Sequence, residues 1–126
     1  MFTGLNPRRA QTSPFHSAGM LVTHIHQLAT VSGQVGVRPD GTVGQGIVEQ
    51  TQIAFENVEA VLAEGRLDLG AVIQYTIHLT DRAHIADFVR AGSPFLPEPR
   101  PACTLLIQAG LASPDLLVQI EALAAI

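Results

Sequence analysis

The middle of the chain carries the clearest pattern of hydrophobic and polar positions. From Ile47 to Glu64 the apolar residues recur every three or four positions, which predicts an amphipathic helix ending at Gly65. From Ala71 to Thr80 apolar and polar residues alternate strictly, as is typical of a strand with one buried face. The predicted apolar face holds Ala71, Ile73, Tyr75, Ile77 and Leu79, and the polar face holds Val72, Gln74, Thr76, His78 and Thr80.

Weaker signals predict the elements before this region. Residues 1–19 are rich in Pro, Ser, Thr and Gly and suit an irregular arm. Residues 20–32 are rich in β-branched side chains, which favours one strand. Gly33 and Gly36 then interrupt short extended pieces, and Pro39-Asp40-Gly41 is a turn signal that would join them as a hairpin.

The second half of the chain predicts one more helix and two more strands. Asp81 can cap the helix, which has Phe88 on its inner face and Gly92 at its end. The strands are expected at residues 102–108 and 116–123, after a loop with four prolines. The order β-β-β-α-β-α-β-β predicts one α+β domain, residues 1–126, with a mixed sheet. Two helices cannot cover both faces of that sheet, so we expect them on one face and a symmetric partner on the other.

Composition supports association with copies of the same chain. Charged residues make up 14% of the 126 residues, against roughly a quarter in average globular proteins. Since a small domain is mostly surface, this shortage of charge predicts that partner subunits cover part of it. All seven basic residues are arginines, which excludes Schiff-base and Walker-type lysine chemistry. The net charge of −4, with dispersed arginines, argues against a nucleic-acid partner.

The single cysteine, the lack of long apolar stretches and the histidines bear on the cellular location and on metal binding. The single cysteine cannot form an intramolecular disulfide, and we find no signal peptide or membrane-spanning stretch, so we expect a cytoplasmic protein without a membrane partner. His24 and His26, two apart on the predicted strand, form a minimal metal pair without a third ligand. We therefore expect interface histidines there, no metal site and no cofactor.

Four segments, in their order and spacing, resemble the RidA/YjgF family, also called L-PSP endoribonucleases. Together with Pro101-Ala102 they cover roughly residues 20 to 124. The segments are Ser32-Gly33-Gln34-Val35-Gly36, Gln50-Thr51 through Phe55-Glu56-Asn57-Val58, Thr76-Ile77-His78-Leu79-Thr80-Asp81, and Leu117-Val118-Gln119-Ile120-Glu121-Ala122. The resemblance implies a chorismate mutase-like fold and a homotrimer with a β-lined core and small-molecule clefts between subunits.

The resemblance also implies hydrolysis of reactive imines and enamines such as 2-aminoacrylate. In active members a serine and a glutamate help order the attacking water, and Ser32 and Glu121 match them here. An arginine that grips the substrate carboxylate follows the Pro-Ala pair in those members, whereas this chain has Cys103. A charge-assisted hydrogen bond is worth roughly 1.5–3 kcal/mol, so binding of a 2-imino acid should weaken about 10- to 100-fold.

Several expectations about individual residues remain open at this point. Cys103 is either a small buried hydrophobe or a cleft thiol that needs an activating neighbour, for which His78 is a candidate. Glu121 is a base for water or a carboxylate paired at an interface. Arg100 should point away from Cys103, and Phe15 competes with Met20 to close the cleft. The expected ligand contacts are Phe15, Gly33, Phe88, Ala102 and Thr104.

Two functions follow from these alternatives. The first is an imine or enamine hydrolase whose substrate depends little on a carboxylate. The second is a non-catalytic trimer that binds or senses a metabolite and has lost deamination together with the arginine. Ribonuclease activity conflicts with an acidic chain that has no lysine.

Overall fold

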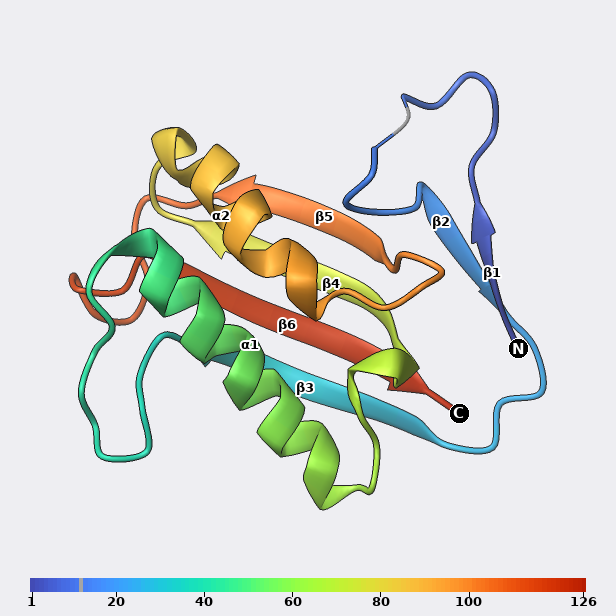
Figure 1. Ribbon diagram of the computed structural model, residues 1–126, viewed down its shortest axis with the longest axis horizontal. Coiled ribbons are helices and arrows are strands. Elements are labelled where there is room, and N and C mark those ends of the chain that lie inside the picture. The colour runs from blue at the N-terminus through green and yellow to red at the C-terminus, as the bar shows by residue number, and fades with distance from the viewer. Residues whose placement is uncertain (12) are drawn as a thin grey trace.

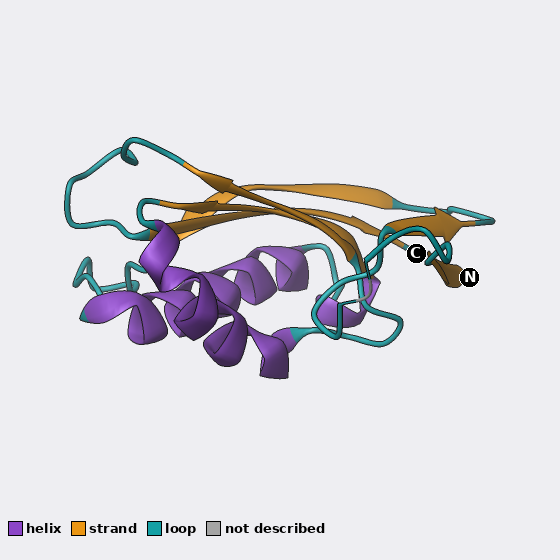
Figure 2. Ribbon diagram, turned by 90° about the horizontal axis from the view of Figure 1, so that it is seen from above, coloured by secondary structure: helices purple, strands orange, loops and turns teal. Residues whose placement is uncertain are grey.

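The computed structural model describes residues 1–11 and 13–126. A four-stranded sheet forms one layer, and the two helices lie together on one of its faces (Figures 1 and 2). The strands of this sheet are β3 (Leu28–Val35), β4 (Val72–Leu79), β5 (Ala102–Ile107) and β6 (Val118–Ala125). The helices are α1 (Gly46–Glu64) and α2 (Ile85–Gly92). The predicted α+β class, with both helices on one face, is confirmed.

The sheet is mixed, as predicted, and its strand order is β3-β6-β4-β5. β6 pairs antiparallel with both β3 and β4, whereas β4 and β5 are parallel. The crossover from β4 to β5 passes through α2, as parallel neighbours require. The C-terminal strand therefore lies inside the sheet, and β5 forms one of its edges (Figure 1).

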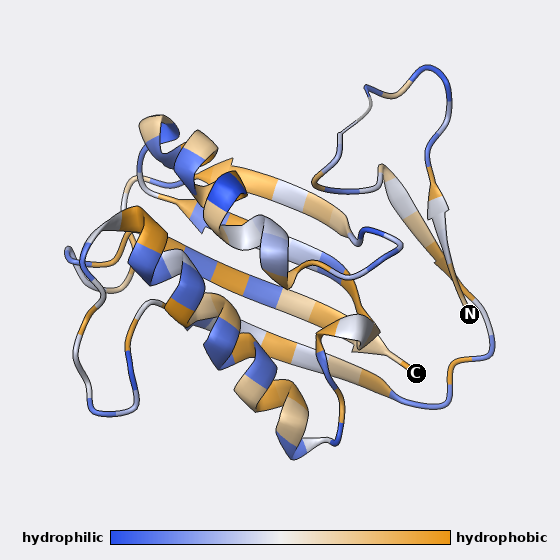
Figure 3. Cartoon of the chain, in the orientation of Figure 1, coloured by the Kyte–Doolittle hydropathy of each residue, from blue (hydrophilic) through white to orange (hydrophobic). Residues whose placement is uncertain are grey.

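The core lies between the helices and the sheet. Phe55 of α1, Phe88 of α2 and Ile77 of β4 are each 0% exposed. Figure 3 shows the matching alternation of hydrophobic and hydrophilic positions along β4 and β6. One assignment was wrong: Val72 is fully buried and pairs with Ala124, on the helix side of the sheet. The register shifts between Val72 and Gln74, because a bulge there moves Val72 to the opposite face from the one predicted.

The N-terminal region differs most from the sequence expectation. β1 (Phe2–Leu5) pairs antiparallel with β2 (Gly19–Val22), so part of the expected irregular arm is a strand. The single strand predicted at residues 20–32 is two strands, β2 and β3, with a connection in which His24 has a φ of 58°. His24 and His26 both lie in this connection and not on one strand. The backbone N–H of His26 donates to the Ile126 carbonyl, which ties the connection to the C-terminus.

Local turn chemistry explains where the other elements begin and end. The turn at Pro39-Asp40-Gly41 is present, with Gly41 at a φ of 88°, but its flanks form only one isolated bridge, between Val37 and Val43. α1 ends at Gly65 as predicted, although Arg66 takes the left-handed conformation, with a φ of 60°. Three short 3₁₀ turns complete the fold: η1 (Leu69–Ala71), η2 (Arg82–His84), which Asp81 caps, and η3 (Ser93–Phe95). Within the described residues, no helix is long and apolar enough to span a membrane.

Candidate functional site on the uncovered face of the sheet

The face of the sheet opposite the helices carries most of the polar side chains of β4. Because neighbouring strands hold paired residues on the same face, the register places Thr76 beside Glu121 of β6 and Thr104 of β5. Figure 2 shows that no helix covers this side of the sheet. The predicted polar face of β4 is therefore part of an uncovered surface that several strands share.

A hydrogen-bonded row of three side chains crosses this face diagonally. His78 of β4 lies between the other two: its Nε2 is 2.5 Å from Oε2 of Glu121 in β6. On the other side, Nε2 of Gln108, just after β5, is 3.0 Å from Nδ1 of His78. The His78 side chain is 15% exposed and that of Glu121 is 45% exposed. The row thus holds the predicted catalytic carboxylate at a fixed place while leaving it open to solvent.

Ser32 and Gly33 lie next to Glu121 in a bulge of β3. Val31 pairs with Ala122 and Gln34 pairs with Ile120, so the two residues between them face the single residue Glu121. Gly33 lies so close to β6 that an added Cβ would be 2.5 Å from the Gln119 side chain. Ser32 is exposed. The structure therefore brings together Ser32, Gly33 and Glu121, which the resemblance assigned to one site.

Cys103 lies on the other side of the sheet. It pairs with Tyr75 and packs with the residues of the core. Burial raises the pKa of the Cys103 thiol to about 11. His78, the candidate activating neighbour, is on the opposite face and hydrogen-bonds Glu121 and Gln108 instead. Within one subunit, the thiol has the environment of a small buried hydrophobe and not that of an activated nucleophile.

The aromatic candidates also lie on the helix side. Phe15 is 9% exposed and makes an edge contact with Phe88, with ring centroids 5.8 Å apart. Phe88 is 0% exposed and also packs on Phe55. The segment that carries Phe15 continues past the edge strand, since the Ser17 N–H donates to the Pro101 carbonyl. Met20 lies in β2, opposite Gly4. Which of Phe15 and Met20 closes the cleft stays a prediction.

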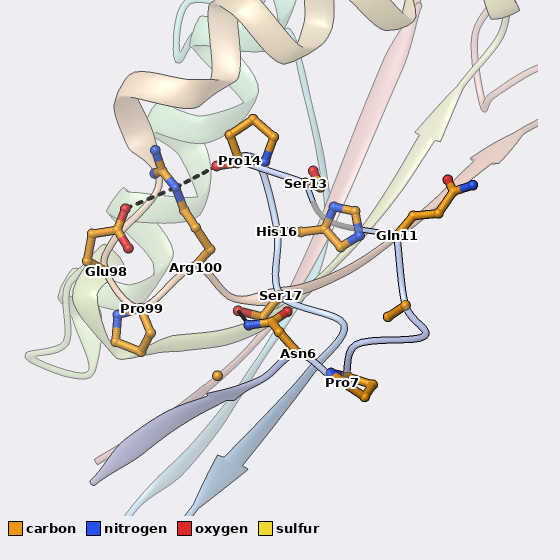
Figure 4. A pocket seen from close by; sticks show the side chains of 12 residues that line it. Asn6, Pro7, Gln11, Ser13, Pro14, His16, Ser17, Glu98, Pro99 and Arg100 are labelled. Atoms are coloured by element: carbon orange, nitrogen blue, oxygen red, sulfur yellow. Dashed lines mark hydrogen bonds and ion pairs between the residues drawn. The ribbon is translucent and has the colours of Figure 1, made fainter.

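Of the remaining candidates, Ala102 and Thr104 lie on β5, and Arg100 lies in the loop before it. Ala102 and Thr104 pair with Gln74 and Thr76 and share the uncovered face with them. Arg100 instead binds the arm and its own loop. Its Nε is 3.0 Å from the Pro14 carbonyl (Figure 4), and its Nη1 is 2.9 Å from the Leu96 carbonyl. Its guanidinium is therefore held by the arm and the loop before β5.

Two hollows accompany these groups. A shallow hollow of about 200 Å³ lies beside Glu121 and is lined by Thr30, Gln74 and Thr76 on the uncovered face. A larger hollow of about 700 Å³ lies between the N-terminal arm and the loop before β5, lined by Asn6, His16 and Arg100 among others (Figure 4). The smaller hollow is next to a carboxylate that can activate water, so it is the better candidate for chemistry.

Comparison with known proteins decides the family. The model of the family described as Endoribonuclease L-PSP matches residues 12–126. The chain belongs to this family. A RutC family protein of Aquifex aeolicus is 38% identical over 52 residues, which are 40% of this chain and 42% of that protein. Mmf1 of Saccharomyces cerevisiae, a mitochondrial protein, is 32% identical over 92 residues, which are 72% of this chain and 61% of Mmf1.

A further relative bears a functional name. The Escherichia coli protein "Putative reactive intermediate deaminase TdcF" is 28% identical over 99 residues, which are 74% of each chain. Among solved structures, the Rid family protein YyfB of Yersinia pestis has a TM-score of 0.88 and 23% identity, covering 99% of this chain and 98% of that one. RidA of a Psychrobacter species has a TM-score of 0.76 and 25% identity, covering 93% and 92%. The fold and the RidA-like character of this family member are thereby shown.

Sequence reasoning missed Gln108 and assigned a different neighbour to His78. The alternation of β4 did predict that His78 lies on the polar face. No local pattern gives the diagonal contacts, because Glu121 is 43 positions and Gln108 is 30 positions from His78 along the chain. Only the strand order β6-β4-β5 brings the three side chains together.

Proposed function

We propose that this RidA family member hydrolyses a reactive imine or enamine to a carbonyl compound and ammonia, with Glu121 as the base for water. One observation carries this proposal: Glu121 is held through Oε2 by His78, at 2.5 Å, beside a solvent-open hollow. Its Oε1 has no hydrogen-bond partner among the described residues and can receive a proton from water. Ser32, opposite Glu121 in the β3 bulge, supplies a hydroxyl that can orient the same water.

The reaction needs only proton transfers from this site. The imine reacts as its nitrogen-protonated form. As Glu121 accepts one proton from water, the oxygen bonds to the carbon of the protonated imine and the C=N π electrons move to nitrogen, giving a neutral carbinolamine. The protonated glutamate then gives its proton to the carbinolamine nitrogen. As the C–N bond breaks and ammonia leaves, the hydroxyl gives its proton to the Glu121 carboxylate and becomes the carbonyl, and Glu121 passes this proton to ammonia, which leaves as ammonium. An enamine first takes a proton on carbon to become the imine. A positioned carboxylate of this kind contributes roughly 10²- to 10⁴-fold to such transfers.

The side chains around Glu121 favour a substrate without a carboxylate. None of the seven arginines lies in β3, β4, β5 or β6, and the chain has no lysine. The hollow offers the hydroxyls of Thr30 and Thr76 and the amide of Gln74, which hydrogen-bond neutral groups. The carboxylate of Glu121 would repel an anionic substrate and attract a protonated imine. We propose a neutral or cationic imine as the substrate class.

The positions of the candidate residues support a cleft between copies of the chain. Ser32, Gly33 and Glu121 lie on the uncovered face, while Phe15, Phe88 and Cys103 lie on the helix side. One subunit cannot join these two groups because the sheet separates them, but a neighbouring copy can place its edge against the uncovered face. A homotrimer, as the resemblance implies, would also cover that face. Sedimentation velocity should then give a mass near three times the 13.4 kDa chain, and a monomer would contradict this arrangement.

Ammonia release from freshly generated imines tests the activity. The panel contains 2-aminoacrylate and a matched imine without a carboxylate. We expect the wild type to prefer the neutral imine and Glu121→Gln to lose roughly 100-fold or more in kcat, while Glu56→Gln, the same change at an exposed helix position, has no effect. Equal rates for the wild type and Glu121→Gln would contradict a base role and favour the metabolite-binding function.

A second variant tests the substrate class. Cys103→Arg restores the residue type that active family members carry after the Pro-Ala pair. We expect it to raise kcat/KM for 2-aminoacrylate relative to the neutral imine by roughly 10- to 100-fold. If the variant folds and the ratio of the two kcat/KM values does not change, residues other than residue 103 set the preference for or against a substrate carboxylate.

A further inference from the structure

Two side chains contact the ring nitrogens of His78, and both contacts fit the same tautomer of the ring. A neutral imidazole carries one proton, on Nδ1 or on Nε2, and its other nitrogen accepts. With the Gln108 amide oriented as in the structure, its nitrogen donates and Nδ1 accepts. The ionised Glu121 can only accept, so Nε2 must donate. Both contacts therefore fit the tautomer that carries its proton on Nε2.

The opposite tautomer would lose both hydrogen bonds. Its Nδ1–H would face the Gln108 amide group, and the lone pair of its Nε2 would face the Glu121 carboxylate. Rotating the Gln108 amide by half a turn would repair the first contact but not the second. Because the His78 side chain is only 15% exposed, water gives limited compensation for such a mismatch.

We infer that His78, with its tautomer set by Glu121 and accommodated by Gln108, is a positioning residue for the proposed base: its Nε2–H holds the Glu121 carboxylate in the orientation that presents Oε1 to water. This inference rests on the proposed function for its catalytic part. A glutamate side chain has three rotatable bonds, and 45% of the Glu121 side chain is exposed, so β6 alone does not hold it in one rotamer. The Nε2–H of His78 restricts rotation of the Glu121 side chain by binding Oε2, the carboxylate oxygen that does not accept the proton from water.

Rates of the wild type and two variants test the catalytic part. His78→Leu removes the donor at similar volume, and His78→Gln keeps an N–H near the position of Nε2. We expect His78→Leu to lower kcat for the neutral imine about tenfold with KM little changed, and His78→Gln to recover most of that loss. His84→Gln, in η2 and outside the row of Glu121, His78 and Gln108, is the control and should match the wild type. Equal kcat for His78→Leu and wild type would overturn the inference.

The tautomer of His78 can be measured by NMR spectroscopy, independently of any enzymatic activity. Long-range ¹H–¹⁵N spectra distinguish the two tautomers, and the His78 signals are assigned by their absence in His78→Gln. Because the Glu121 carboxylate alone requires a donor at Nε2, we expect protonated Nε2 and unprotonated Nδ1 in the wild type and in Gln108→Leu, and loss of this preference in Glu121→Gln, whose amide can donate or accept. A proton on Nδ1 in the wild type, or an unchanged preference in Glu121→Gln, would overturn the inference. If the wild type hydrolyses no imine while the tautomer is as expected, the proposed function fails and the positioning of Glu121 stands.

Discussion

Cys103 and Tyr75 are paired residues of neighbouring parallel strands, and both side chains lie on the helix side of the sheet. Tyr75 packs edge-on against Phe55, with ring centroids 5.4 Å apart. Burial raises the pKa of both groups above their usual values. The residue that follows Pro101-Ala102 is therefore in contact with the core and separated by the sheet from the Glu121 carboxylate.

The thiol of Cys103 should react slowly in the folded protein. Burial raises its pKa from 9.0 to about 11, so at pH 8 the reactive thiolate should be about 100-fold scarcer than for an unshifted thiol. We expect a disulfide reagent such as DTNB to label the native protein at least that much more slowly than the urea-unfolded chain. The native rate should rise with pH until about 11, since deprotonation supplies the nucleophile. Comparable native and unfolded rates would show an accessible thiol.

The hydroxyl of Tyr75 is buried without a hydrogen-bond partner among the described residues. Folding removes this hydroxyl from water without giving it another partner, which costs roughly 1–3 kcal/mol. We expect Tyr75→Phe to leave the free energy of unfolding unchanged or to raise it by about 1 kcal/mol, measured by urea denaturation. A clear loss of stability would reveal a partner for the hydroxyl, such as a bound water. Thr51→Val tests the same effect at the other buried hydroxyl without a partner.

Gln50 joins α1 to two loops through a side chain that is only 2% exposed. Its Oε1 accepts from the Leu117 N–H at 2.8 Å, and its Nε2 donates to the carbonyls of Gly44 and Asp115 at 3.1 and 2.9 Å. Gln50→Leu would remove all three partners, so we expect the free energy of unfolding to fall by about 3 kcal/mol. Gln52→Leu, on the exposed side of the same helix, is the control and should change it little. Similar stabilities for the two variants would contradict the stabilising role of these three hydrogen bonds.

Gly36, just after β3, packs directly against Gln50 of α1. An added Cβ would be 2.6 Å from the Cα of Gln50, and backbone at that distance cannot move aside cheaply. We expect Gly36→Ala to lower the midpoint of urea unfolding, with a loss of about 2 kcal/mol or more. Gly110→Ala is the matched control, because an added Cβ there meets nothing within 4 Å. Equal midpoints for the two variants would show that the contact relaxes without cost.

Much of the fold could be predicted from local pattern. The spacing of three and four residues around Phe55 and the alternation through Ile77 identified α1 and β4, because a buried face repeats with the period of its own backbone. The N-terminal region could not be predicted in this way. β1 and β2 are four residues each and stabilise one another by pairing, so neither carries a long enough pattern of its own.

The sequence by itself determined the family, the two helices, the interior strands and the absence of the arginine at residue 103. Only the tertiary structure decided on which face of the sheet each candidate lies and which candidates meet. The physical reason is that a one-residue bulge, as at Val72 or at Ser32 and Gly33, shifts the alternation of a strand, and no local pattern reveals it. The row of Glu121, His78 and Gln108 likewise exists only because three strands distant in sequence are neighbours in the sheet.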